Sequence, residues 1–314
     1  MFSNLIKFTF LIICICFTNV SKAQSKRDNI INKIVLPVLN SDRYKDNSDY
    51  NEIKTIITKL EKDYGYEASL KRRLLEPSYY HNDLSFFKAE LTTLIKDYGF
   101  DVAYMKGTEN YYSDLITGQM AVWFKEMYLK NHVIWLSNNF DKQIEKRKLN
   151  TINEKDQSIT AFAMKVLNID GLDSLQQTTI KEYLSEYHFK NIEPVLSIVK
   201  NKNIFPNDKS FALLQGGFDT VLIHNFQFKK NLNEVWNVLF PTIKQAYLKN
   251  EITNVIFQNY DFYHYQQYGS LVFGSYSIEQ LPEQFRQTEK GPIPIKDEAW
   301  LENIKKEFKW GNKY

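Results

Sequence analysis

The chain has 314 residues, of which 43% are hydrophobic and 15% aromatic, so it is long enough and apolar enough to bury a sizeable core. Its 40 basic and 37 acidic residues nearly cancel. A chain with so small a net charge lacks the excess of basic residues that is typical of nucleic-acid-binding proteins. We therefore expect no nucleic-acid partner.

The first 23 residues have the pattern of a cleaved secretory signal. Lys7 precedes an apolar run at residues 8–17 that is too short to span a bilayer, and small residues lead to a cleavage point before Gln24. A retained anchor is the alternative, but no second apolar run follows to stop transfer. We expect a periplasmic or extracellular protein with no integral membrane segment after signal cleavage.

Both cysteines, Cys14 and Cys16, lie in this signal, so the mature chain has none. Each follows an isoleucine where lipoprotein processing needs a small residue, which disfavours lipidation. The mature chain therefore has no disulfide and no thiolate chemistry, and its fold depends on core burial. Loss of Lys7 and Lys22 leaves 38 basic against 37 acidic residues.

Few glycines and prolines, with long stretches of alternating apolar and charged residues, predict a mainly α-helical protein. In the first half, helices are expected over residues 49–64, 84–98 and 114–140. The first two end in Tyr-Gly-aromatic, a common cap in which glycine relieves left-handed strain. Tyr187-His188-Phe189 is a weaker copy. A duplicated helical unit is the alternative, but two close copies do not make a solenoid.

Residues 142–156 are polar and charged without apolar periodicity, which predicts a domain junction. The length also suits two modest domains better than one. We therefore divide the chain into a signal at residues 1–23, a helical N-terminal region at 24–148 and a C-terminal helical domain at 149–314.

Helical spacing continues beyond the junction and then gives way to short β-like segments. The expected helices cover residues 156–167, 173–187, 211–228, 233–250 and 253–265. Pro241 predicts a kink or a fresh helix start. Residues 269–276 and 292–295 predict a small β-hairpin element before a last helix at 297–308.

A series of short motifs follows the junction in a recognisable order. They are Asp156-Gln157, Asp173 with Tyr187-His188-Phe189, His224, Leu239-Phe240-Pro241, Asp261, Gln266-Gln267-Tyr268-Gly269-Ser270, and Pro294-Ile295-Lys296-Asp297. In this order they resemble the bacterial family catalogued as domain of unknown function 6624, over residues 154–310 or half of the chain. The family has no assigned activity. The resemblance implies a binding site containing Asp156, Gln157, Gln266, Tyr268 and Gly269.

This chain departs from the family pattern at several positions. Phe262 stands where the family has arginine, and Leu271 stands where it has a second glutamine. The segment between Asp261 and Tyr268 is also shorter than usual. Part of the family's charged pattern is therefore missing, which favours a diverged binding or structural form.

His224 and Asp261 are the candidate catalytic residues. A histidine in this position can act as a base or ligand near physiological pH, or it can be a buried histidine bonded to a carbonyl or carboxylate. Asp261 is its expected partner, because a carboxylate in an aromatic helix needs donors. Equally, Asp261 can cap or bridge without chemistry. Asp261 and His264 share a helix face, but two ligands at one spacing are common by chance, and we predict neither metal nor cofactor.

Two functions remain open, because the sequence has no nucleophile elbow, phosphate loop, dinucleotide fingerprint or zinc or calcium motif. The first is a non-catalytic exported module that binds an unidentified protein or polymer. Its expected surface is an aromatic patch of Tyr79, Tyr80, Tyr111, Tyr112 and Trp123. The second is a hydrolase-like enzyme in which His224 and Asp261 share an open pocket with Asp156 and Gln266.

Overall fold

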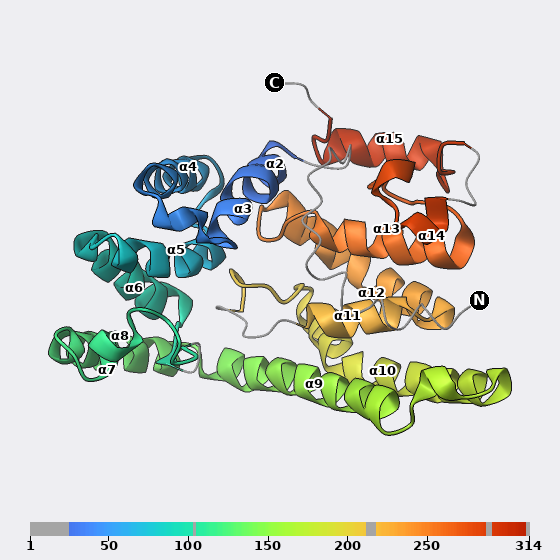
Figure 1. Ribbon diagram of the computed structural model, residues 1–314, viewed down its shortest axis with the longest axis horizontal. Helices are drawn as coiled ribbons and strands as arrows, with labels where there is room; N and C mark the ends of the chain where they lie inside the picture. The colour runs from blue at the N-terminus through green and yellow to red at the C-terminus, as the bar shows by residue number, and fades with distance from the viewer. Residues whose placement is uncertain (1–24, 103–104, 212–217, 287–290, 312–314) are drawn as a thin grey trace.

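The computed structural model describes residues 25–102, 105–211, 218–286 and 291–311, and these residues are mostly helical (Figure 1). The prediction of a mainly α protein is therefore confirmed. The signal predicted at residues 1–23 and residues 212–217 of one predicted helix lie outside the described residues. In the part of the chain that is described, no helix combines the length and the apolar character needed to cross a membrane.

The N-terminal region is a stack of short and medium-length helices. They are α2 (Lys26–Ile30), the π-helical turn η2 (Ile31–Val35), α3 (Leu36–Leu39), the 3-10 turn η3 (Asp42–Lys45), α4 (Asn47–Tyr64), α5 (Ala68–Tyr80), α6 (Leu84–Tyr98), α7 (Tyr112–Ile116) and α8 (Ala121–Asn138). Gly65 and Gly99 end α4 and α6 with positive φ angles of 86° and 62°, as the Tyr-Gly pattern predicts. The helix predicted at 114–140 is interrupted, because a turn at residues 117–120 separates α7 from α8.

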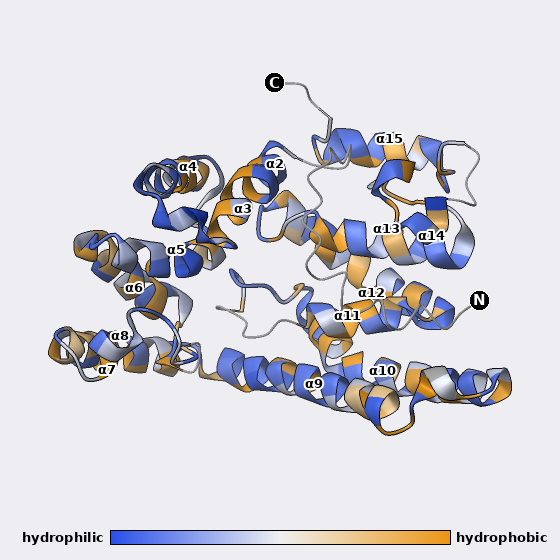
Figure 2. Ribbon diagram, in the orientation of Figure 1, coloured by the Kyte–Doolittle hydropathy of each residue, from blue (hydrophilic) through white to orange (hydrophobic). Residues whose placement is uncertain are grey.

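Two long helices, α9 (Phe140–Lys165) and α10 (Ser174–Lys202), run side by side, with the 3-10 turn η5 (Ile169–Gly171) between them (Figure 1). α9 passes without a break through residues 142–156, so no linker interrupts the chain at the predicted junction. Figure 2 shows why the sequence hides this helix, since most of α9 is hydrophilic. Its buried positions recur at helical spacing, but they combine apolar residues such as Leu149 and Ile152 with the polar side chains of Gln143, Lys146 and Asp156.

The predicted start of α10 is correct, and its predicted end is wrong. Asp173 caps the helix and forms a capping box with Gln176. The helix was expected to stop at Tyr187, but it continues to Lys202 and ends at Asn203, whose φ is 52°. His188 occupies the position where a glycine would supply the left-handed stop, and histidine instead continues the helix.

The C-terminal part adds further helices above α9 and α10 (Figure 1). They are α11 (Asp219–Phe226), α12 (Lys229–Leu248), α13 (Val255–Tyr268), the 3-10 turn η6 (Ile278–Gln280), α14 (Glu283–Arg286) and α15 (Glu298–Glu307). α12 is one helix that contains Pro241. The predicted β-hairpin is not seen in the described residues, where Leu271 and Ile295 form only an isolated parallel bridge.

Separate hydrophobic clusters fill the two halves. The C-terminal cluster begins at Leu149 and is rich in aromatic rings, including a Trp236–Tyr260 stack with centroids 3.9 Å apart. Two clusters in the N-terminal region involve residues up to Met127. The clusters thus fall on either side of residue 148, while the boundary itself stays a prediction because α9 crosses it.

Helix α2 is joined to the C-terminal part by buried polar contacts. Asp28 is fully buried and accepts hydrogen bonds from the Tyr247 hydroxyl and the Asn254 backbone N–H. The buried Arg27 guanidinium donates to both oxygens of Glu67 and to the carbonyl of Ile252. These contacts position α5, which carries Glu67 at its N-cap, beside the C-terminal helices.

Candidate functional site

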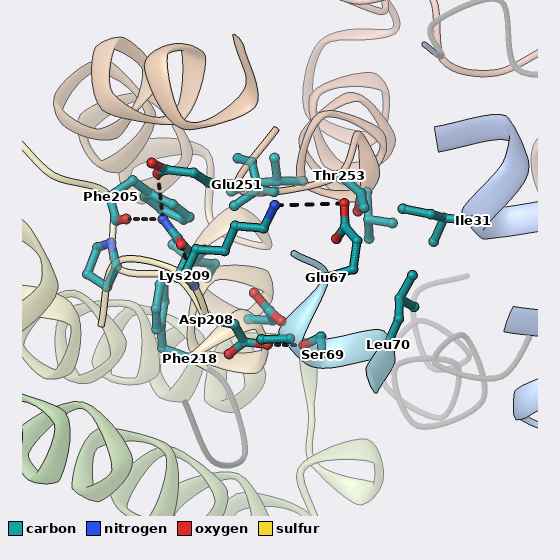
Figure 3. Close-up of a pocket in the computed structure, with 18 of the residues that line it drawn as sticks. Ile31, Glu67, Ser69, Leu70, Phe205, Asp208, Lys209, Phe218, Glu251 and Thr253 are labelled. Carbon is teal, nitrogen blue, oxygen red and sulfur yellow. Dashed lines mark hydrogen bonds and ion pairs between the residues drawn. The ribbon is translucent and has the colours of Figure 1, made fainter. Parts of the chain in front are cut away.

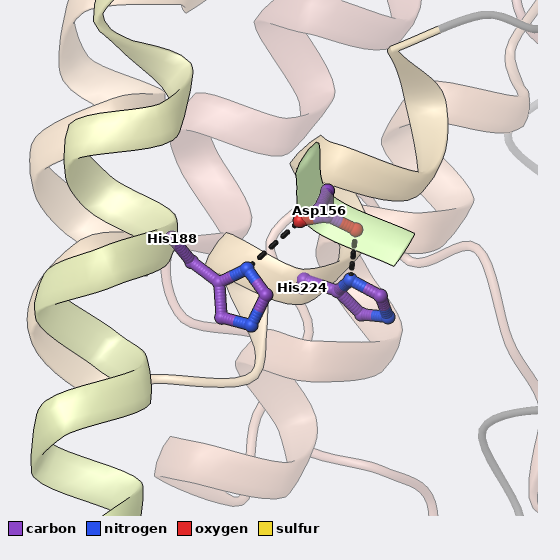
Figure 4. A group of neighbouring side chains, drawn as sticks. All are labelled: Asp156, His188 and His224. Carbon is purple, nitrogen blue, oxygen red and sulfur yellow. Dashed lines mark hydrogen bonds and ion pairs between the residues drawn. The ribbon is translucent and has the colours of Figure 1, made fainter. Parts of the chain in front are cut away.

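Three ligand-type side chains from three helices meet in the C-terminal part (Figure 4). Asp156 comes from α9, His188 from α10 and His224 from α11. The His188 Nδ1 lies 2.8 Å from Oδ1 of Asp156, and the His224 Nδ1 lies 2.5 Å from Oδ2. With an ionised Asp156, each ring therefore donates a hydrogen bond to one carboxylate oxygen. We call these three residues the Asp-His-His cluster.

The Asp-His-His cluster is buried, and its charge is balanced locally. Asp156 is 0% exposed, while His188 and His224 are 4% and 6% exposed. Burial alone would raise the pKa of Asp156, but hydrogen bonds from His188 and His224 and their charges outweigh it, so the pKa of Asp156 is lowered. The Gln157 Nε2 adds a third donor, 3.2 Å from Oδ2 of Asp156.

Asparagine side chains fix the helices that carry the cluster. The Asn191 Nδ2 donates to the carbonyl of Ile152, which joins α10 to α9. The Asn225 Nδ2 donates to the carbonyls of His188 and Val221, which joins α11 to α10. Because these donors bond to backbone rather than to mobile side chains, they hold the three helices in a defined register.

The cluster has the residue types of a metal site or of a base with its orienting carboxylate. Among the residues that the structure describes, these three form the only group of three or more metal-ligating side chains close enough to share an ion. Their ligand atoms lie within 4.8 Å of one another. An imidazole held at Nδ1 by a carboxylate also presents Nε2 as a proton acceptor.

A separate cavity of about 520 Å³ lies between α5 and the C-terminal helices (Figure 3). We call it the α5–α11 cleft. Its lining includes charged side chains of both signs, among them Arg27, Glu67, Arg72, Asp208, Lys209 and Asp219. None of the Asp-His-His residues lines it.

Some of the charged groups in the α5–α11 cleft are already engaged. The Lys209 Nζ lies 3.7 Å from Oε1 of Glu67 (Figure 3). It also donates to the carbonyl of Asn250. The Ser69 hydroxyl donates to the Asp208 carboxylate. These contacts join α5 to the C-terminal part through Glu67, Ser69, Asp208 and Lys209, which all line the cleft.

The expected partner of His224 was the wrong aspartate. Asp261 is fully buried in α13, and its carboxylate accepts backbone N–H groups of Val272, Phe273 and Ser275 at 2.7 to 2.8 Å. Burial raises the pKa of Asp261 to about 6, although these hydrogen bonds act to lower it. Asp261 therefore anchors the loop after α13, and His224 pairs with Asp156 instead.

The remaining predicted binding residues are spread over two places. Asp156 and Gln157 belong to the Asp-His-His cluster and its surroundings. Gln266 is half-buried in α13, Tyr268 is 38% exposed at its end, and Gly269 is its left-handed cap. No hydrogen bond among the described residues joins this second group to Asp156. The helix predicted to stop at residue 265 thus continues to Tyr268, and Gln266 and Tyr268 lie in its last turn.

Tyr268 contacts the beginning of α12 rather than the cluster. Its hydroxyl accepts a hydrogen bond from the Asn233 Nδ2, and the Lys229 Nζ lies 4.7 Å from its ring centroid. The neighbouring His264 hydrogen-bonds through Nδ1 to the carbonyl of Ser270. Asp261 bonds to backbone amides and His264 to a backbone carbonyl, so both side chains of the pair considered from their spacing contact the backbone.

The predicted aromatic patch is only partly at the surface. Tyr80 is 52% exposed, but Tyr111 is 5% exposed and belongs to the core. Tyr79, Tyr112 and Trp123 are half-buried against that core. These residues therefore pack the N-terminal region more than they extend its surface.

His188 is the site residue that the sequence did not identify. The expected helix end at Tyr187 placed it in a cap, whereas the observed helix places it on the buried face with Ile192 and Val195. The spacing from His188 to Ile192 and Val195 is that of one helix face, and this signal is present in the sequence.

No protein-family model, curated protein or solved structure matches this chain.

Proposed function

We propose that this protein is an exported, non-catalytic helical module that binds a polymer segment, most simply a polypeptide, in the α5–α11 cleft. The observation that carries this proposal is the cavity of about 520 Å³ with charged groups of both signs on its walls. Clefts between packed units, with a few convergent polar groups, are the usual places for ligands.

Like charges lie close together within the α5–α11 cleft. Desolvation, and next the charge of Arg72, lowers the pKa of Arg73. Desolvation and the charge of Asp208 raise the pKa of Asp219, although the Asp219 side chain is accessible to solvent. Both side chains are exposed, so the contribution that matters to each shift is the second one, a neighbouring like charge that an incoming group of opposite sign would offset. A ligand with separate acidic and basic groups fits this pattern, as a polypeptide segment does.

Export and family membership are parts of the same proposal. The Lys7 start, the short apolar run and the small residues before Gln24 support a cleaved signal. The order of motifs from Asp156 to Asp297 supports a relation to domain of unknown function 6624. Mass spectrometry of the exported protein would show an N-terminus at Gln24, and a retained residue 1 would contradict the signal.

Selection of short random peptides on the immobilised mature protein tests the binding proposal. We expect selected peptides to carry both acidic and basic residues, and Arg72→Glu and Asp219→Lys to weaken them about tenfold or more. Lys59→Glu, an exposed charge reversal on α4, is the matched control and should leave binding unchanged. Peptides that bind all four proteins equally would place the binding surface outside the α5–α11 cleft.

The second candidate is a hydrolase-like enzyme, favoured by the carboxylate held at Nδ1 of His224. In this version Asp156 replaces Asp261 as the orienting residue. The candidate predicts a hydrolytic activity that falls at least about a hundredfold in His224→Ala, the usual range for a general base. It also predicts that Arg72→Glu leaves that activity intact. A hydrolase screen without any His224-dependent turnover would count against it.

A further inference from the structure

We propose that Asp156, His188 and His224 bind one divalent transition-metal ion, and that zinc is the ion whose chemistry fits them best. The site is distinct from the α5–α11 cleft, so the proposal stands whether or not the cleft binds a peptide. It assigns a ligand to residues that the peptide-binding proposal leaves as a buried polar contact.

The donor set selects the class of metal. Two imidazoles and one carboxylate are ligands typical of zinc and of cobalt, nickel or copper. Calcium and magnesium require several oxygen ligands, and the cluster offers a single carboxylate. We therefore expect the site to discriminate strongly against both of these ions.

The backbone brings the donors together before any metal arrives. The ring centroids of His188 and His224 lie 5.0 Å apart with an interplanar angle of 51°. Both Nδ1 atoms face the same carboxylate (Figure 4). Hydrogen bonds from Asn191 and Asn225 to backbone carbonyls fix α10 against α9 and α11. The ligands are thus preorganised, which reduces the entropy cost of binding.

The separations in the cluster are those of the metal-free form. Nδ1 to oxygen distances of 2.8 and 2.5 Å are hydrogen-bond distances. Zinc bonds of about 2.0 to 2.2 Å place neighbouring tetrahedral ligand atoms roughly 3.3 Å apart. The ion therefore enters if the two nitrogen–oxygen pairs open by less than about 1 Å while ligand atoms up to 4.8 Å apart close to the same separation. Side-chain torsions can supply both movements.

Protons and charge balance in this step. In the metal-free form each ring donates to ionised Asp156 from Nδ1, so Nδ1 carries a proton. When the metal takes the Nδ1 lone pair, that proton moves through solvent to Nε2 of the same ring, and Asp156 stays ionised. A ring whose Nε2 starts unprotonated keeps its proton in this way, whereas a ring protonated on both nitrogens releases one proton to solvent, and no oxidant or reductant is required. Three protein ligands leave a fourth position for water.

Metal titration of the mature protein, first freed of metal with a chelator, is the direct test. We expect saturable binding of one zinc ion per chain by calorimetry, and tetrahedral cobalt absorption bands that zinc abolishes. Magnesium and calcium should give no saturable heat. Absence of saturable zinc binding in the wild-type protein would overturn the proposal.

Histidine variants locate the ion. His188→Gln and His224→Gln should each weaken zinc binding at least about tenfold. His264→Gln is the matched control, because His264 is also buried but bonds to the carbonyl of Ser270. His81→Gln is a second control, a half-buried histidine of the N-terminal region that also bonds to a backbone carbonyl. Equal affinity in the cluster variants, or loss only in the controls, would place the ion elsewhere.

A measurement on the wild-type protein avoids any dependence on variant folding. Nitrogen-15 NMR of the imidazole rings reports which nitrogen carries the proton. We expect His188 and His224 to be Nδ1-protonated without metal and to become Nε2-protonated when zinc is added. Rings that keep Nδ1–H at saturating zinc would show that zinc does not bind in this cluster through Nδ1, and that outcome overturns the proposed site.

Discussion

Asp156 and Asp261 are two fully buried carboxylates whose surroundings differ in kind. Asp261 is held by three backbone N–H groups from one loop, residues 272–275, close to it in sequence. Asp156 is held by imidazoles from two other helices, His188 and His224. The first carboxylate fixes a local turn, whereas the second joins α9, α10 and α11.

The difference appears in the direction of their pKa shifts. Burial raises the pKa of Asp261 to about 6 in spite of its amide donors. Burial acts in the same direction on Asp156, but hydrogen bonds and charges from two ionisable rings leave its pKa lowered. Backbone dipoles thus compensate only part of the cost of burial, while partners that can themselves carry charge compensate more than all of it.

The largest effect should come from removing the amide-bound carboxylate. Asp261→Ala leaves the buried N–H groups of Val272, Phe273 and Ser275 without their acceptor, so we expect a loss of at least about 3 kcal/mol in the free energy of unfolding. Urea unfolding measures it. Asp297→Ala is the control, because Asp297 caps α15 through one exposed N–H and should cost only about 1 kcal/mol. Equal losses would refute the role of burial.

The two carboxylates should also respond oppositely to acid. Asp261 has a folded pKa of about 6, above its unfolded value, so its folded state binds the proton more tightly. Between about pH 4 and pH 6 this favours folding as pH falls, by up to about 3 kcal/mol, and the gain is lost as pH rises through 6. Asp156, with a lowered pKa, stabilises the fold above its unfolded pKa and loses that effect at lower pH.

Comparison of the wild type with Asp261→Asn isolates this contribution. The free energy of unfolding of the wild type, minus that of the variant, should increase as pH falls from 6 to 4, since asparagine does not titrate there. The same difference taken with Asp156→Asn should stay level over this range and decrease only in stronger acid. Parallel profiles for the two variants would contradict the assignment of opposite shifts.

A smaller loss is expected when one ring is removed from Asp156. In the metal-free protein, His224→Ala should lower the free energy of unfolding by about 1 to 3 kcal/mol, because one carboxylate oxygen loses a donor. His264→Ala should cost less, since the ring of His264 bonds to a neutral carbonyl and charged acceptors make stronger bonds. The reverse order in thermal or urea unfolding would show that the carboxylate contact adds nothing.

Local signals in the sequence predicted the helices that depend on local chemistry. α4 and α6 have apolar stripes and glycine caps, and their ends agree with prediction within two residues. The part of α9 before the helix predicted at residues 156–167 was missed because Gln143 and Lys146 occupy buried positions where an apolar residue would have revealed the helical period. The prediction of a β-hairpin was wrong because residues 271 and 295, which are far apart in the sequence, form a single parallel bridge instead of two antiparallel strands.

For the site as well, the sequence predicted what depends on local chemistry and missed what depends on the packing of helices. Asp156 and His224 were recognised as individual candidates from motifs, but their pairing depends on how α9 packs against α11, which no local pattern encodes. Asp261 was a plausible partner because buried carboxylates need donors. Its loop amides met that need instead. His188 was missed because a predicted helix end removed it from the buried face.

The smallest effect should come from Gln157, the neighbour of Asp156 in α9. Its Nε2 lies 3.2 Å from Oδ2 of Asp156, a longer contact than either imidazole makes, and its side chain is half-buried. Two rings continue to hold the carboxylate in Gln157→Ala, so we expect a loss below about 1 kcal/mol in urea unfolding.

Ser158→Ala, at an exposed position of the same helix, provides the baseline for a surface substitution. If Gln157→Ala cost as much as His224→Ala, the amide and not the second imidazole would complete the stabilisation of Asp156. The contrast with Asp261 would then disappear, because both carboxylates would depend on uncharged amide donors. A loss near the Ser158→Ala baseline, together with a larger loss in His224→Ala, instead assigns the stabilisation of Asp156 to the two rings.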